Sequence, residues 1–135
     1  MKITDGFMPF RDYQTYYRIA GEPGQAPPLL LLHGGPGYTS RGFEILDQLA
    51  DLTRRQIISY DQLGCGKSSM PDQPELWRPE TWLEELAALR RHLGLERIHL
   101  LGHSWGGMLA IQYLCDMQPP GVLSLILSST LPSVS

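Results

Sequence analysis

The residues with the clearest chemical potential lie at 102–107, which read Gly-His-Ser-Trp-Gly-Gly. A short apolar segment, 98–101, precedes them, and an apolar segment of helix-forming residues, 108–114, follows. Gly-x-Ser-x-Gly between a strand and a helix is the pattern of a nucleophile elbow, a sharp turn that exposes a serine hydroxyl above a sheet. The pattern therefore predicts that Ser104 is a nucleophile. A serine in an ordinary glycine-rich turn is the alternative, and the apolar flanks argue against it.

The two glycines of this pattern have a steric reason. We expect Gly102 and Gly106 to pass so close to the neighbouring strand or helix that a Cβ at either would collide with it. Ser104 would then stand at the N-terminus of a helix, where free backbone N–H groups and the helix dipole favour negative charge. The backbone N–H of Trp105, directly after the nucleophile, is the expected donor to an oxyanion, while its side chain packs nearby.

A second glycine-rich segment, 33–37, reads His-Gly-Gly-Pro-Gly and follows four consecutive leucines at 29–32. Such an apolar run is typical of a strand that is buried on both faces of a parallel sheet. The glycines leave the backbone free to present its N–H groups. His33 has the chemistry of a general base, but at the tip of a strand we expect it to hold backbone carbonyl groups instead. His103 is also expected to be structural.

A third segment, 61–68, reads Asp-Gln-Leu-Gly-Cys-Gly-Lys-Ser after the apolar strand predicted at 56–60. Its end is similar to a phosphate-binding P-loop, but that motif requires a glycine where Asp61 stands. Nucleotide binding is therefore not indicated. We expect instead a tight turn that borders the active site.

Apolar strands alternate with helical patterns along the chain, which predicts an α/β fold with a mostly parallel sheet and right-handed crossovers. Two strands are expected in the first twenty residues, the second at 13–20, and a last strand at 122–127. One helix should begin at Pro79 and end at Gly94. Another should carry two adjacent apolar stripes, formed by Phe43, Leu46 and Ala50 and by Ile45, Leu49 and Leu52.

Length and composition limit the function further. The 135 residues carry a net charge of −3, so the chain offers no basic field for nucleic acid, and their number suits one domain or part of one. Cys65 and Cys115 lie far apart and are expected to be free thiols in a reducing compartment. Neither a signal peptide nor a membrane-spanning run is evident, so we expect a cytoplasmic protein.

Together, the three glycine-rich motifs resemble those of the proline iminopeptidase (prolyl aminopeptidase) family of α/β-hydrolases, over nearly the whole chain. The resemblance implies attack by Ser104 on an N-terminal residue, typically proline, and an acyl-enzyme intermediate, with no metal or other cofactor. It also implies oxyanion donors at Gly35 and Trp105. The surrounding active-site loop would comprise His33, Gly34, Pro36 and Gly37.

Some amino-acid amidases share these motifs, so an amidase or esterase of the same fold is a second interpretation. Epoxide hydrolases and haloalkane dehalogenases share the fold but place an aspartate at the elbow, and Ser104 argues against them.

The sequence departs from this family in one respect. Hydrolases of this fold carry their triad in the order serine, acid, histidine. Here no histidine follows Ser104, and Asp116 is the only acid that does. We therefore expect residues 1–135 to be an incomplete α/β-hydrolase core that ends about where the family's helical cap would begin.

The missing acid and base lead to two expectations about partners. Either a C-terminal part of the same hydrolase supplies the acid and the base, as a separate polypeptide or as a portion lost by truncation or cleavage, or the chain is a non-catalytic half-domain. In the second case it would self-associate through an open sheet edge at 122–127. The substrate would be a small peptide or amino-acid amide. The order of preference among N-terminal residues and the oligomeric state stay open.

Overall fold

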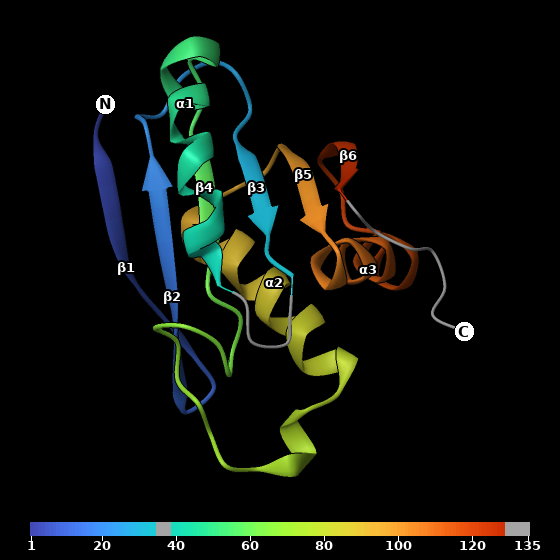
Figure 1. Cartoon of the computed structure of the whole chain (residues 1–135). Coiled ribbons are helices and arrows are strands. Elements are labelled where there is room, and N and C mark those ends of the chain that lie inside the picture. The colour runs from blue at the N-terminus through green and yellow to red at the C-terminus, as the bar shows by residue number, and fades with distance from the viewer. Residues whose placement is uncertain (35–38, 129–135) are drawn as a thin grey trace.

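A computed structural model describes residues 1–34 and 39–128, which form a six-stranded sheet in the order β1-β2-β4-β3-β5-β6 with helices on both faces (Figure 1). None of the described helices is long and apolar enough to cross a membrane. The strands are β1 (Ile3–Phe10), β2 (Tyr13–Ala20), β3 (Leu29–Leu32), β4 (Ile57–Tyr60), β5 (Ile98–His103) and β6 (Val122–Ser128). The α-helices are α1 (Gln48–Thr53), α2 (Pro79–Leu93) and α3 (Trp105–Gln112).

The sheet is mostly parallel, as the sequence predicts. Strands β4, β3, β5 and β6 run parallel to one another, whereas β1 and β2 form an antiparallel pair beside β4. Because β3, β4 and β5 are adjacent and parallel, their carboxyl ends meet at one edge of the sheet. All three glycine-rich motifs begin at that edge.

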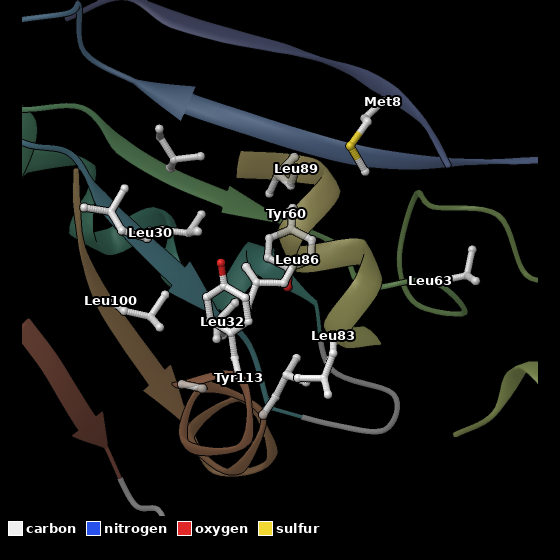
Figure 2. Close-up of a cluster of buried hydrophobic side chains, with 14 of the residues drawn as sticks. Met8, Leu30, Leu32, Tyr60, Leu63, Leu83, Leu86, Leu89, Leu100 and Tyr113 are labelled. Atoms are coloured by element: carbon white, nitrogen blue, oxygen red, sulfur yellow. The ribbon is translucent and has the colours of Figure 1, made fainter. Parts of the chain in front are cut away.

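The four leucines of β3 are all buried, and they serve two different cores. Leu30 and Leu32 join the cluster beneath α2 and α3, together with Leu86, Leu100 and other side chains shown in Figure 2. Leu29 and Leu31 lie on the opposite face, in the cluster that packs beneath α1. Strand alternation thus sends successive side chains into separate layers, and this confirms the prediction of a strand buried on both faces.

The segment predicted as one helix with two stripes differs from that expectation. It begins as a 3₁₀ helix over Ser40–Asp47 and only then becomes α1. Ile45 and Leu52 are 78% and 77% exposed, so their assignment to a buried stripe was wrong. A 3₁₀ turn holds about three residues rather than 3.6, which shifts the faces, and Leu52 lies about 200° around α1 from the buried Ala50.

Helix α2 fits the prediction at both ends. Pro79 is its first residue, and Gly94 ends it in the left-handed conformation with φ of 66°. Near that end the buried Arg90 donates hydrogen bonds to the carbonyl groups of Leu95, Glu96 and Pro120 and to the hydroxyl of Tyr113. This guanidinium therefore fastens the end of α2 to the segments that lead into β5 and β6. The π-helical turn that carries Tyr113 (Tyr113–Met117) was not predicted.

One carboxyl group lies inside the core. The Glu85 side chain is fully buried, where it accepts hydrogen bonds from the Thr15 hydroxyl at 2.6 Å and from the Leu63 backbone N–H at 3.0 Å. Burial outweighs these bonds and raises the pKa of Glu85 from 4.5 to about 7. The neutral carboxyl group is therefore the form that the fold favours.

This burial predicts a pH-dependent stability. Between pH 4.5 and about 7 the folded chain holds a proton on Glu85 that the unfolded chain releases. The free energy of unfolding should thus fall as pH rises through this window, by about 3 kcal/mol in total from this group.

Glu85→Gln keeps the shape and an acceptor for Leu63, so it should remove this slope and be the more stable protein at pH 8. Urea unfolding of both proteins from pH 4.5 to 8 measures the difference, in which the titration of all other groups cancels. A constant difference across the range would contradict the assignment.

Candidate active site

The turn between β5 and α3 is built around Ser104. This residue has φ of 53° and ψ of −117°, a conformation that non-glycine residues rarely adopt. Its carbonyl oxygen accepts hydrogen bonds from the N–H groups of Gly107 and Met108, at 2.9 and 3.2 Å. Its own N–H donates to the carbonyl of Ser128 on β6 at 2.9 Å. Bonds on both sides thus hold the serine in a strained position at the carboxyl edge of the sheet.

The glycines of the motif sit where no side chain fits. A Cβ on Gly102 would lie 2.5 Å from the Cα of Gly107, within the first turn of α3. A Cβ on Gly106 would lie 2.2 Å from the carbonyl oxygen of Leu32 and 2.6 Å from that of His33, at the end of β3. All three distances are far below van der Waals contact. The helix can therefore start directly against two strands only because these positions lack side chains.

Trp105 is the first residue of α3. An N–H group in the first turn of a helix precedes the helix's own hydrogen-bond ladder, so it can face a ligand. The indole of Trp105 points to another loop, because its Nε1–H donates to Oε1 of Gln62 at 3.1 Å. Its ring also meets Trp82 edge-on at 6.0 Å between centroids, and Trp82 stacks on Trp77 at 5.7 Å.

His33 does not have the environment of a general base. Its side chain is 2% exposed, and burial lowers the pKa of the imidazole. The Nε2 atom accepts the backbone N–H of Gln62 at 3.0 Å, so the proton lies on Nδ1 and is donated to the carbonyl of Gly34. Both ring nitrogens of the neutral imidazole are therefore engaged by backbone groups.

Asp61 organises the third motif. Its Oδ1 accepts the N–H and the hydroxyl of Ser40, each at 2.8 Å, and its Oδ2 accepts the N–H of Lys67 at 2.9 Å. A Cβ on Gly66 would lie 2.3 Å from that second oxygen. The carboxylate therefore closes the loop on itself and ties it to the start of the 3₁₀ helix.

Sequence reasoning missed Gln62. Its side chain is 1% exposed and donates from Nε2 to the carbonyl of His33 at 3.0 Å while it accepts from the indole of Trp105. The sequence signal was a second polar residue, next to Asp61, just beyond a buried strand. Its importance depends on the strand order, which places the end of β4 beside the end of β3.

The remaining predicted residues are placed as follows. Gly35, Pro36 and Gly37 lie outside the described residues. Asp116 is exposed in the π-helical turn and accepts a hydrogen bond from Gln112 on its own helical segment at 3.2 Å. Within residues 1–34 and 39–128, no three His, Cys, Asp or Glu side chains gather as metal ligands would.

Comparisons with known proteins agree with this geometry. The sequence model of the family described as alpha/beta hydrolase fold matches residues 27–135. The proline iminopeptidase of Lactobacillus helveticus is 62% identical over 136 aligned residues, which cover 100% of this chain and 46% of that protein. The proline iminopeptidase of Clostridium botulinum is 60% identical with the same coverage.

A solved structure gives a similar match. The crystal structure of the proline iminopeptidase of Mycobacterium smegmatis superposes with a TM-score of 0.84 at 40% identity. The match covers 90% of this chain and 42% of that one. The chain thus spans about half the length of the curated relatives it matches.

The packing at the elbow predicts that Gly106→Ala is severely destabilising, because the new Cβ would meet two rigid backbone carbonyl groups. We expect a loss of about 3 kcal/mol or more in the free energy of unfolding, measured in urea. Gly42→Ala is the matched control, since a Cβ at that helical position meets nothing within 4 Å. Equal stability of the two variants would contradict the close approach of α3 to β3.

Proposed function

The chain belongs to the α/β-hydrolase family, and we propose that it forms the N-terminal part of a serine aminopeptidase that releases proline, or a similar residue, from the N-terminus of peptides. The observation that carries this proposal is the identity of about 60% to proline iminopeptidases over the whole chain. The strained turn at Ser104 supports it, because a nucleophile elbow needs a serine in such a conformation between a strand and a helix.

In the proposed reaction, Ser104 Oγ attacks the carbonyl carbon of the N-terminal residue and its proton passes to a base. The backbone N–H of Trp105 stabilises the oxyanion, and Gly35 is the second donor that the resemblance to the family implies. Each such donor is worth about 3–4 kcal/mol of transition-state stabilisation. The peptide C–N bond then breaks, and the amine leaves with a proton from the base. Water finally hydrolyses the acyl-enzyme.

We propose that the base and its acidic partner come from residues beyond these 135. No histidine follows Ser104 in the sequence. The four histidines present are engaged elsewhere: His33 holds backbone groups, His99 and His103 contact serines of β6, and His92 packs its ring against Tyr17. The relatives' greater length supports a remaining part that supplies both groups.

Removal of the nucleophile tests the proposal. Residues 1–135 can be joined to the C-terminal remainder of the 62% identical Lactobacillus helveticus enzyme. We expect this chimera to release 4-nitroaniline from L-prolyl-4-nitroanilide, and Ser104→Ala to lower kcat by about 10⁴-fold or more. A fluorophosphonate probe should label the parent but not this variant.

Cys115→Ser, which alters an exposed thiol, is the control and should keep both activities. Turnover that survives Ser104→Ala would refute the nucleophile. Faster cleavage of esters or of other aminoacyl amides would favour the amidase or esterase interpretation instead.

A second candidate function, self-association without catalysis, rests on the exposure of β6. This strand pairs only with β5 in the described sheet. Leu123, Ile126 and Leu127 on it are 45%, 48% and 45% exposed. An apolar edge strand of this kind is a template for pairing with another chain, whether the remaining part of the hydrolase or a second copy.

We therefore expect the 135-residue chain alone to elute as a dimer or larger species in size-exclusion chromatography with light scattering. The double variant Leu123→Lys/Ile126→Lys should shift it toward the monomer, because charged side chains oppose edge pairing. Ile45→Lys is the control, since Ile45 is also exposed but lies far from β6 in sequence and outside the sheet. A parent chain that is monomeric at the same concentration would refute self-association.

A further inference from the structure

We infer that Gln62 is a positioning residue for catalysis, whose carboxamide fixes the start of α3 against the end of β3. This inference rests on the proposed function of Ser104 and Trp105. Gln62 is the second residue after β4, and its side chain is almost fully buried. It does not itself border Ser104 in the chain, so its effect would pass through the residues that it holds.

The hydrogen bonds of the carboxamide have only one possible arrangement. An indole N–H is solely a donor, and a backbone carbonyl is solely an acceptor. The Oε1 atom must therefore face Trp105, at 3.1 Å, and Nε2 must face the carbonyl of His33, at 3.0 Å. A carboxamide supplies both functions in one plane, whereas a carboxylate or an apolar group of similar size supplies one or neither.

Gln62 is attached to His33 a second time. Its backbone N–H donates to Nε2 of the imidazole at 3.0 Å, and the imidazole in turn donates from Nδ1 to Gly34. The ends of β3 and β4 are thus joined through both backbone and side chain. The bond to Trp105 extends this joint to the first residue of α3.

The position of this joint matters because the carbonyl of His33 has two neighbours. Gly106 passes so close to it that a Cβ there would lie at 2.6 Å, and Gln62 donates a hydrogen bond to it. The backbone of Trp105 lies between Gly106 and the nucleophile. Loss of the hydrogen bond between the Trp105 indole and Gln62 would therefore shift the backbone N–H of Trp105, which we propose as an oxyanion donor. Contacts to the substrate farther from this point would stay in place.

The experiment uses the chimera described above and three variants. Gln62→Met removes both hydrogen bonds but keeps the length of the side chain. Trp105→Phe removes the indole donor but leaves the backbone N–H in place. Trp82→Phe is the matched control. Trp82 belongs to the same aromatic cluster as Trp105, but its indole N–H donates to the carbonyl of Leu63 and not to Gln62.

We expect Gln62→Met and Trp105→Phe to lower kcat by roughly 10- to 100-fold with little change in KM, because displaced donors affect the transition state more than the bound substrate. Trp82→Phe should retain the parent rates. A fall in kcat that is equally large in Trp82→Phe, or a change confined to KM, would overturn the inference.

Gln62→Glu adds a readout that general loss of structure would not produce. A neutral carboxylic acid can donate to His33 and accept from Trp105, whereas a carboxylate cannot donate. The ratio of kcat for Gln62→Glu to that of the parent should therefore rise as pH falls. The titratable neighbours His33, Asp61 and Glu85 are common to both proteins, so their titration cancels in the ratio. A ratio that does not change with pH would contradict the proposed role of the Gln62 hydrogen bonds to His33 and Trp105.

Labelling of Ser104 by a fluorophosphonate separates this inference from the proposed substrate. A parent chimera that is labelled but does not cleave the prolyl amide would refute the proposed aminopeptidase activity. The labelling rates would then decide whether Gln62 positions the residues around Ser104. Those rates should fall in Gln62→Met and Trp105→Phe and not in Trp82→Phe. A parent chimera that is neither active nor labelled would overturn both proposals.

Discussion

The close approach of α3 to the end of β3 is the constraint on which the rest of this structure depends. Carbonyl groups of β3 point at the position where a side chain of Gly106 would begin, and the helix backbone itself occupies the space beside Gly102. A helix that starts this close to the sheet carries its free N–H groups to the sheet edge. The strained conformation of Ser104 follows, because the chain must reverse within one residue between the end of β5 and the start of that helix.

Such strain is maintained only by a rigid surrounding. Two apolar clusters, one on each face of the sheet, hold β3, β4 and β5 in register. At the carboxyl ends of these strands the loops are held by buried polar side chains. The imidazole of His33, the carboxylate of Asp61 and the amide of Gln62 each form hydrogen bonds with backbone groups of the loops. Hydrophobic burial thus supplies stability, and directional hydrogen bonds fix where the loops sit.

In the described residues, β6 is an edge strand of the sheet and pairs only with β5. Strand β6 supplies a carbonyl that holds Ser104 N–H, and it also exposes apolar side chains. The strand that accepts the hydrogen bond of Ser104 is therefore also the strand on which we propose that a further chain pairs. Binding there would bring new residues toward the carboxyl edge of the sheet, which is where the proposed reaction needs an acid and a base.

The sequence by itself determined the α/β architecture, the bounds of most strands and the position of the elbow. These features depend on local patterns: four leucines in succession, a proline at the start and a glycine at the end of α2, and glycines around Ser104. Local patterns did not reveal that residues 40–47 form a 3₁₀ helix, whose first residue, Ser40, is hydrogen-bonded to the distant Asp61.

Only the tertiary structure decided the contacts of Gln62 and the protonation state of Glu85. The order of the strands places β4 between β2 and β3, and this brings Gln62 to residues 29 and 43 positions away in the chain. The sequence shows only that position 85 of α2 is polar. The packing buries this carboxyl group in the core, and burial raises its pKa. Contacts between such distant residues depend on how the layers pack, and a single sequence carries no local signal for them.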